Sequence, residues 1–133
     1  MSSDEAFDLS THPVHLGLGA RAVREPAFEG PAFYAAYDER HAGDGAEGRL
    51  VALHDFDAPW TGWEMHPAGE ELVVCLGGSI TLIQEIDGEQ RRVLLREGQA
   101  AINPRGVWHT ADVDGPTKVL FITPGDGTTH RPR

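Results

Sequence analysis

The chain changes character at residue 49, and from there to residue 124 it consists of short apolar or alternating segments separated by turn residues. Short segments of this kind, bounded by Gly, Pro and Asp-Gly pairs, are typical of β-strands joined by tight turns. The Asp87-Gly88 pair in particular predicts a hairpin. About eight such segments favour an antiparallel sandwich or barrel over a helical bundle. The expected strands are Arg49–Phe56, Trp60–His66, Glu71–Leu76, Ser79–Ile86, Arg91–Leu95, Gln99–Asn103, Val107–Val113 and Lys118–Thr123.

The composition fits a globular domain and argues against several classes of partner. The length of 133 residues fits one domain, and 40% hydrophobic and 24% charged residues are ordinary values for a globular protein. The net charge of −10 repels phosphate backbones and anionic lipid heads, so we expect neither a nucleic acid nor a membrane as partner. The single cysteine, Cys75, permits no internal disulfide and lies in an apolar run typical of a buried residue. The acidic N-terminus lacks the apolar segment of a secretory signal, so we expect a cytoplasmic protein.

The pattern divides the chain into three parts: an N-terminal arm and short helix packing on the barrel (1–48), the barrel itself (49–124) and a C-terminal tail (125–133). The polar residues 1–13 predict a loose arm. Pro31 at a first helical position, with Phe33 and Tyr37 one turn apart, predicts a short helix over residues 32–40. The tail is a small basic patch, for which docking and free movement both stay open.

One segment carries the first candidate site residues. In a strand, residues two apart point to the same face, so Glu64 and His66 share one face, about 6–7 Å apart at Cα. Trp63 and Met65 share the other face. Glu71 begins the next expected strand, and a neighbouring antiparallel strand can bring its side chain back to the same point. The same alternation is also what a half-exposed strand without any site shows.

A second segment places His109 after the turn Pro104-Arg105-Gly106. His109 shares its strand face with Val107, Ala111 and Val113. A histidine on an apolar face is more often a core residue than a ligand, but an apolar wall also controls the access of solvent to a metal site. Two such segments in one small chain favour a metal site.

The first segment resembles the first motif of the cupin superfamily, which reads Gly-x5-His-x-His-x3-4-Glu-x6-Gly. In this chain His66, Glu71 and Gly78 match the second His, the Glu and the closing Gly. Glu64 stands where the motif has its first His, and Ala58 replaces the opening Gly.

The second segment resembles the second cupin motif, Gly-x5-Pro-x-Gly-x2-His-x3-Asn. Gly98, Pro104, Gly106 and His109 match it, and Val113 replaces the final Asn. The resemblance implies an all-β protein, a small single-domain cupin built as a double-stranded β-helix (jelly-roll) barrel with a pocket inside it.

The resemblance also implies four metal ligands: Glu64 (by position), His66, Glu71 and His109. Glu70 is an alternative to Glu71, because the family spacing allows either. Two histidines and two carboxylates leave a divalent ion close to neutral, which suits a buried site. The oxygen-rich donor set favours Fe(II), Mn(II) or Ni(II), and Zn(II) also remains open.

The function that this site predicts is that of a metal-binding cupin of unknown substrate, an oxygenase or isomerase of a small oxygenated molecule. Glu64 is then the catalytic residue, a ligand that swings away to act as a base. The alternative is a non-catalytic module that binds or senses a small molecule or a metal, which an apolar pocket around Val107, Ala111 and Val113 would favour. A barrel kept for its structure alone is the third interpretation, because one fold carries many functions.

Several aromatic and polar residues complete the predictions. Tyr34 and Tyr37 are candidates to cap the barrel mouth, and Arg105 is interpreted as a solvated turn residue. His54 is expected at the surface or rim, with a place in the pocket wall as the alternative. We expect a homodimer, because large apolar side chains face outward from the expected strands. These side chains are Trp63, Met65 and Trp108.

Overall fold

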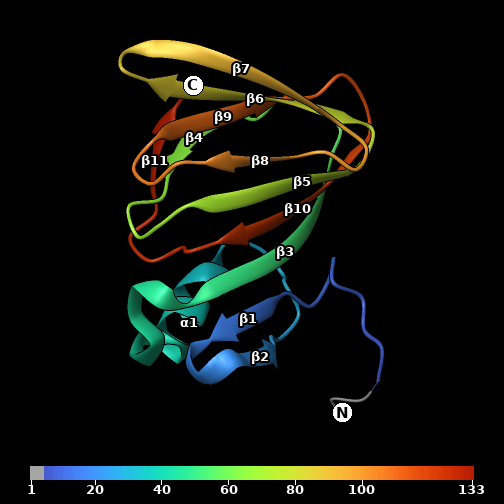
Figure 1. Cartoon of the computed structure of the whole chain (residues 1–133). Coiled ribbons are helices and arrows are strands. Elements are labelled where there is room, and N and C mark those ends of the chain that lie inside the picture. Colours follow the sequence, from blue (N-terminus) through green and yellow to red (C-terminus); the bar gives the residue numbers. More distant parts are fainter. Residues whose placement is uncertain (1–4) are drawn as a thin grey trace.

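The computed structural model describes residues 5–133, and the start of the arm expected over residues 1–13 lies outside the described residues. Two antiparallel sheets face each other, and β2 and the C-terminus lie at opposite ends of the molecule (Figure 1). The larger sheet has six strands in the order β2-β1-β3-β10-β5-β8, and the smaller has five in the order β11-β4-β9-β6-β7. No helix within residues 5–133 is long and apolar enough to cross a membrane.

The strand bounds are β1 Val14–Gly17, β2 Arg21–Arg24, β3 Arg49–Phe56, β4 Gly62–Met65, β5 Glu71–Gly77, β6 Ser79–Ile86, β7 Glu89–Arg96, β8 Ala100–Asn103, β9 Trp108–Asp112, β10 Thr117–Thr123 and β11 Thr129–Pro132. Between β3 and β11 the chain changes sheet at every connection except the hairpin that joins β6 to β7. This path closes a jelly-roll barrel, as the resemblance implied. Each of the eight strands expected between residues 49 and 124 is present, with ends shifted by a few residues.

The predicted hairpin at Asp87-Gly88 is confirmed. Ile86 pairs with Glu89, and the two central residues have φ angles of 55° and 79°. Positive φ at both positions is the turn geometry that matches the twist of paired strands, and Asp-Gly adopts it readily. Local turn chemistry therefore sets the register of β6 and β7.

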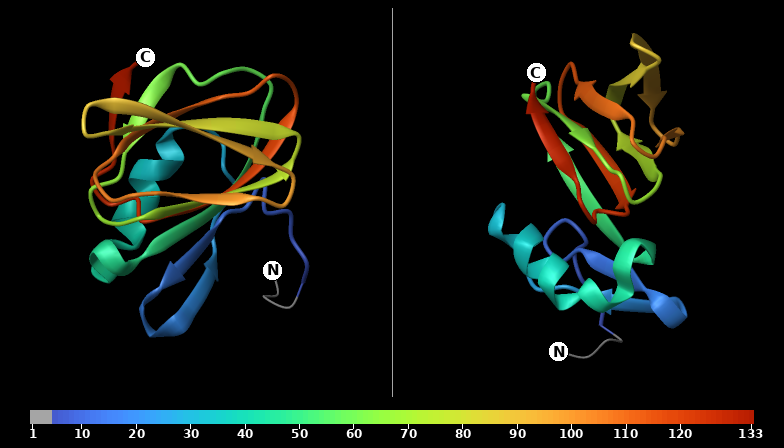
Figure 2. Two further views of the ribbon diagram at one scale, coloured as in Figure 1. Left: turned by 45° about the horizontal axis from the view of Figure 1, so that its top comes forward. Right: turned by 90° about the vertical axis from the view of Figure 1, so that its left-hand side faces the viewer.

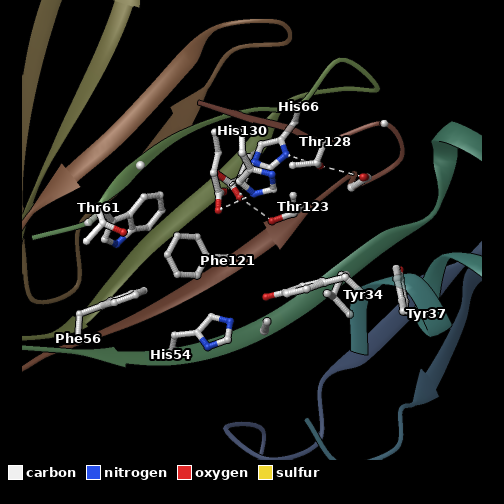
Figure 3. Close-up of a pocket in the computed structure, with 18 of the residues that line it drawn as sticks. Tyr34, Tyr37, His54, Phe56, Thr61, His66, Phe121, Thr123, Thr128 and His130 are labelled. Carbon is white, nitrogen blue, oxygen red and sulfur yellow. Dashed lines mark hydrogen bonds and ion pairs between the residues drawn. The ribbon is translucent and has the colours of Figure 1, made fainter. Parts of the chain in front are cut away.

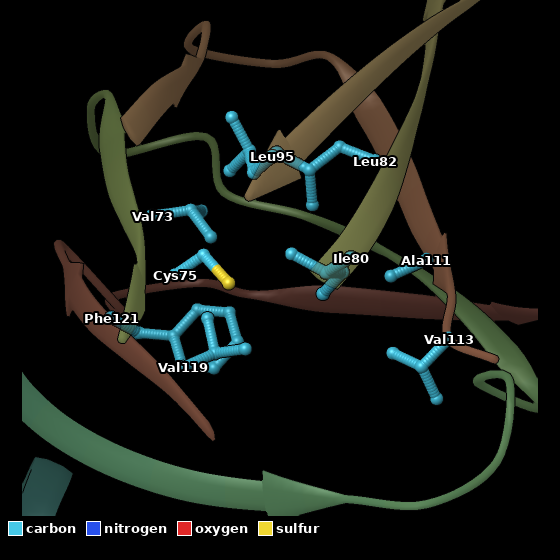
Figure 4. Close-up of a cluster of buried hydrophobic side chains, with 9 residues drawn as sticks. All are labelled: Val73, Cys75, Ile80, Leu82, Leu95, Ala111, Val113, Val119 and Phe121. Carbon is cyan, nitrogen blue, oxygen red and sulfur yellow. The ribbon is translucent and has the colours of Figure 1, made fainter. Parts of the chain in front are cut away.

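The main core fills the space between the two sheets (Figure 4). Alternation along the strands places every second side chain inside, so both sheets contribute to one cluster. Its buried members are Val73, Cys75, Ile80, Leu82, Leu95, Ala111, Val113, Val119 and Phe121. Cys75 is fully buried, as expected for a small apolar residue. Ala111 and Val113 lie in this core and not on a pocket wall. The apolar pocket that would favour a non-catalytic binding module is therefore not formed by these two residues.

The N-terminal elements extend the larger sheet at one end of the barrel (Figure 2). β1 pairs with β3, and β2 pairs with β1. The helix α1 spans Ala32–Arg40 as predicted, with Pro31 before it in a helical conformation. Its two buried residues, Phe33 and Tyr37, pack with Leu50 and Ala52 of β3 in a second small cluster. Two 3₁₀ segments, η1 Leu18–Ala20 and η2 Ala42–Glu47, complete this part.

A buried histidine joins the N-terminal elements to one another. His15 on β1 makes hydrogen-bond contacts with the Tyr37 hydroxyl at 2.6 Å and with Asp44 at 2.5 Å. Arg21 lies 3.1 Å from the same carboxylate. Because these contacts join a strand, the helix and η2, they hold α1 in a defined position beside β3.

The C-terminal tail docks as a strand, which decides the question that the sequence left open. β11 pairs with β4, with Arg131 opposite Trp63. The Arg131 guanidinium lies 5.0 Å from the Trp63 ring centroid and 4.5 Å from that of Trp108, and it bonds Glu85 at 2.6 Å. Trp63 is only 7% exposed. The outward tryptophans are thus covered within the chain, and the surface on which the predicted homodimer rested is not free.

We expect Gly78→Ala to lower the free energy of unfolding by about 3 kcal/mol, from backbone strain and steric overlap together. Gly78 has a φ of +70°, and a Cβ there would lie 2.4 Å from the Pro116 carbonyl oxygen. The matched control is Gly88→Ala, at φ +79° with open space around it, where strain alone predicts a loss of about 1–2 kcal/mol. Urea unfolding of both variants checks this, and equal losses would contradict it.

Candidate functional site

A cavity of about 740 Å³ lies between the smaller sheet, β3, β10 and helix α1 (Figure 3). Tyr34 and Tyr37 of α1 form part of its wall, as predicted for residues that cap the barrel mouth. His54 also lines the cavity. Three of the four predicted metal ligands line it as well: Glu64, His66 and Glu71.

Strand pairing places the predicted ligands together. Glu64 on β4 lies directly opposite His109 on β9, and both point into the barrel. His66 follows β4, and its Nε2 lies 3.7 Å from Glu64 Oε2. His109 Nε2 lies 4.0 Å from the same oxygen. Two segments distant in sequence therefore meet at one point, as the resemblance implied.

Glu71, the first residue of β5, faces this point from the larger sheet. Its two carboxylate oxygens lie 3.3 Å from His66 Nε2 and 3.3 Å from His109 Nε2. Glu71 is 3% exposed, whereas Glu70 is exposed to solvent. Of the two alternatives, only Glu71 lies beside the histidines.

Two hydrogen bonds from neighbouring side chains hold the Glu71 carboxylate in position. Asn103 Nδ2 donates to Oε1 at 2.9 Å, and the Thr123 hydroxyl donates to Oε2 at 2.6 Å. Gln84 Nε2 on β6 donates to Asn103 Oδ1 at 2.9 Å, so the chain of bonds runs from one sheet to the other. Sequence reasoning missed these supporting residues, because nothing in their spacing marks them as partners of Glu71.

The partners of the imidazole Nδ1 atoms assign both tautomers. The Thr128 hydroxyl donates to the Gly125 carbonyl at 2.8 Å, so it accepts from His66 Nδ1, which lies 2.8 Å away. His109 Nδ1 faces the Val107 carbonyl at 3.3 Å, and a carbonyl only accepts. Both neutral rings therefore carry their proton on Nδ1 and leave a lone pair on Nε2. Histidines that ligate metals are held in this way by a partner of the second ring nitrogen.

Both Nε2 atoms are buried and make no hydrogen bond. Metal bonds of about 2.0–2.2 Å place neighbouring ligand atoms about 3.0–3.5 Å apart. The separations from Glu71 already match this range, and those from Glu64 exceed it by a few tenths of an ångström. Two buried lone pairs beside two carboxylates form a donor set suited to a divalent cation. The residues present thus fit the metal that the resemblance implied.

The Glu71 carboxylate and the neighbouring imidazoles each favour the charged form of the other. Burial alone would raise the pKa of Glu71, but the two neighbouring imidazoles outweigh it and hold that pKa well below its usual range. Burial alone would lower the pKa of His109, but the Glu71 carboxylate, with a smaller effect of Glu64, raises it. Glu71 is therefore an anion across the physiological range, and it attracts a positive charge, as a proton or as a metal ion.

A residue outside the two motifs also reaches the site. His130 on β11 lies opposite Glu64, with its Nε2 3.5 Å from Glu64 Oε1. Only the unexpected pairing of the tail with β4 brings it there. Arg105 is exposed and does not line the cavity, in agreement with its interpretation as a turn residue.

A second group of ionisable residues, His15, His41 and Asp44, lies outside the cavity. The two imidazole rings are stacked with centroids 3.7 Å apart and planes within 16°, so their lone pairs run side by side and do not converge. His15 uses both ring nitrogens in contacts with Tyr37 and Asp44. This geometry is suited to structural hydrogen bonding and not to holding an ion.

In metal-free protein, at a pH where the rings are neutral, we expect both His66 and His109 to be protonated on Nδ1. Long-range ¹H–¹⁵N spectra of the imidazoles distinguish the two tautomers. Thr128→Val, which removes the acceptor of the His66 proton, should change the His66 tautomer and leave that of His109 unchanged. A proton on Nε2 of either ring in the unaltered protein would contradict the assignment.

Solved structures of other proteins share this fold. An oxalate oxidase aligns with a TM-score of 0.52 and 19% identity, over 61% of this chain and 45% of that one. A hydroquinone 1,2-dioxygenase in complex with Cd²⁺ and 4-hydroxybenzonitrile aligns with a TM-score of 0.51 and 16% identity, over 56% of each chain. This chain therefore spans about half the length of these enzymes. A cupin-2 domain protein from Shewanella frigidimarina aligns with a TM-score of 0.48 and 19% identity, over 64% of this chain and 71% of that one.

Comparison with protein families gives a match to the family described as "Cupin domain" over residues 57–123. Comparison with curated proteins gives no match. The matched residues run from the start of the first motif to the end of β10, and they include both histidines and both glutamates of the site. The chain belongs to the cupin family.

Proposed function

We propose that this protein is a metal-dependent enzyme that acts on a small oxygenated molecule in the cavity, as an oxygenase or an isomerase. The observation that carries the proposal is the pair of buried, unpartnered Nε2 atoms of His66 and His109, which face the carboxylates of Glu64 and Glu71. Buried polar atoms without partners are rare in folded proteins and call for an explanation such as an ion.

Charge balance supports a divalent ion. Two anionic glutamates and two neutral imidazoles bring the total charge with such an ion to about zero, which lowers the cost of burial. The mixture of two nitrogens and two carboxylate groups suits Fe(II), Mn(II), Ni(II) or Zn(II). A metal in this position would polarise an oxygen atom of a bound substrate.

Glu64 is the residue proposed to act in catalysis. It is 33% exposed and faces the cavity, whereas Glu71 is held by two hydrogen bonds. Glu64 therefore has the freedom to move and to take a proton from a substrate, while Glu71 keeps its position. His130, 3.5 Å from Glu64 and 67% exposed, lies between this carboxylate and solvent and can pass the proton on.

The structural neighbours agree with this class of function. The two that align with TM-scores above 0.5 are an oxidase of oxalate and a dioxygenase of hydroquinone, and the second is seen with a metal ion and a small aromatic molecule. By analogy with these two enzymes, we propose that this protein uses a metal ion and acts on a small oxygenated substrate. A metal or ligand sensor built on the same fold would bind the ion and show no turnover.

We expect Mn(II), Fe(II), Ni(II) or Zn(II) to raise the melting temperature of the metal-free protein. A ligand at a hundred times its Kd stabilises the folded state by about 2.7 kcal/mol. His109→Ala should abolish this rise, because it removes one of the two lone pairs. His12→Ala, which alters a histidine outside the site, is the control and should retain it. No shift with any of the four ions, together with no metal in untagged protein by elemental analysis, would refute the proposed site.

We also propose that the protein forms a homodimer, through a face other than the predicted one. The outer face of the larger sheet presents rows of aliphatic side chains in register across β3, β10, β5 and β8. They are Val51, Leu53, Leu72, Val74, Ile102, Leu120 and Ile122. Four strands about 4.8 Å apart and some five residues long form a patch of about 300 Å². That is the size at which the largest apolar patch of a monomer is often functional.

A second copy suits this face because of its charges. Arg49 and Asp55 lie on the same outer face of β3, at its two ends. A twofold axis that crosses the middle of β3 places Arg49 of each copy near Asp55 of the other. The aliphatic rows between them carry no charge, so two copies of net charge −10 repel each other least there.

We expect light scattering to give the mass of a dimer, and Ile102→Lys to give the mass of a monomer. Ile102 is 55% exposed on the proposed face, and a charge buried there is costly. Leu94→Lys is the control, because Leu94 is 52% exposed on the other sheet. A monomeric unaltered protein at high concentration, or equal effects of the two variants, would refute this interface.

A further inference from the structure

The cavity wall is unusual in its charges. Among the residues that the structure describes, those lining the cavity include three carboxylates, Asp38, Glu64 and Glu71, but no lysine and no arginine. A site that binds carboxylate or phosphate groups normally offers a guanidinium or an ammonium group to them. This cavity offers none from the chain itself.

Three arginines of α1 and the C-terminal tail are held in ion pairs away from the cavity. Arg40 of α1 bonds Glu25 at 2.8 Å, and Arg131 of β11 lies on the outer face of the smaller sheet, bonded to Glu85. Arg133 bonds Asp112 at 2.5 Å. No rearrangement of one rotamer brings these charges to the cavity without breaking an existing ion pair.

An anionic substrate would therefore meet an unfavourable charge. With a divalent ion, Glu64 and Glu71 already bring the total charge of the site to about zero, so a bound carboxylate would leave a net negative charge in a partly desolvated space. Like charges in a medium of low dielectric repel strongly. An uncharged molecule avoids this cost.

The apolar part of the wall is aromatic. Phe56, Trp60 and Phe121 form one cluster, with ring centroids between 5.7 and 6.1 Å apart. Tyr34 reaches in from α1, with its hydroxyl directed toward Phe121 and His54 (Figure 3). Ring faces and edges of this kind stabilise a flat aromatic ligand by stacked or edge-to-face contacts.

The cavity has room for a ligand with more than one ring. A cavity of about 150 Å³ is sufficient for benzene. The space of about 740 Å³ here is several times larger, and it is within the usual range of sites that bind drug-sized molecules. A single ring would leave much of the aromatic wall uncovered.

We propose that the substrate is an uncharged, hydroxylated aromatic molecule with more than one ring, bound with its hydroxyl group toward Glu64 and His66 and its rings between Tyr34 and the Phe56–Trp60–Phe121 cluster. This inference deepens the proposed function and rests on it for the role of the hydroxyl group. The selection against anions rests on the cavity wall alone.

The polar groups beside the aromatic wall are uncharged as well. Burial raises the pKa of Tyr34, with smaller contributions from Glu64 and Glu71, so its hydroxyl stays protonated. Burial lowers the pKa of His54, against smaller opposite effects of Glu64 and Asp55, so its imidazole stays neutral. Both groups can donate or accept one hydrogen bond from a second neutral substituent of the ligand.

The test compares two probes with the same ring system, 2-naphthol and 2-naphthoate, by calorimetric titration at pH 8. We expect 2-naphthol to bind at least tenfold more tightly than 2-naphthoate, both to metal-free protein and to protein loaded with Zn(II). Naphthoate binding as tightly as naphthol, or no binding of either probe, would overturn the proposal. Because the metal-free arm needs no ion, a protein that binds no metal but keeps the preference would refute the proposed function and leave the selection intact.

A variant that adds a positive charge to the cavity wall makes the test more specific. Thr61 lines the cavity, is exposed and lies in the loop before β4, so a longer side chain there does not disturb the core. Thr61→Lys should lower the preference for naphthol at least tenfold, because it supplies the missing cation. Thr61→Gln, of similar length and uncharged, should keep the preference. An unchanged preference in the lysine variant would show that charge does not select the ligand.

Discussion

Two carboxylates and two imidazoles share the interior of the barrel, and the need to balance their charges there governs the structure of the site. Glu71 is almost fully buried, so it cannot rely on water for its stability. Its oxygens receive hydrogen bonds from Asn103 and Thr123 and face the two histidines. Asn103 and Thr123 occupy one side of the Glu71 carboxylate, and the Thr128 hydroxyl and the Val107 carbonyl occupy the Nδ1 atoms of the two imidazoles. The remaining position for a positive charge lies between Glu71 and the two Nε2 atoms.

The rest of the fold supports this position from three directions. The pairing of β4 with β9 sets Glu64 opposite His109, and the bond from Gln84 to Asn103 joins the sheets behind Glu71. The helix α1, held through His15, closes one side of the cavity. The C-terminal strand closes another side with Thr128 and His130. Segments outside the two motifs thus build most of the wall that a substrate would touch.

Local sequence patterns predicted the strands of the barrel and the helix, but they did not predict which distant segments pair. Turn residues and alternation identified the eight strands from β3 to β10, and the Phe33–Tyr37 spacing identified α1. The pairing of β11 with β4 was missed, because the tail has no alternation of its own and gains its strand conformation from a neighbour. For the same reason the tryptophans were expected on a free surface, although Arg131 covers them.

The order of residues along the chain by itself determined which side chains share a strand face, because alternation in a strand has a period of two. Together with the resemblance to the two motifs, it made Glu64, His66 and His109 candidates for one site. It could not decide whether Glu70 or Glu71 turns toward them, nor which residues hold their protons and charges. Those outcomes depend on which strands lie side by side and on which carbonyls and hydroxyls then come within hydrogen-bonding distance. Except for the Val107 carbonyl, two residues before His109, these groups are distant in sequence from their partners, and only the closed barrel brings them together.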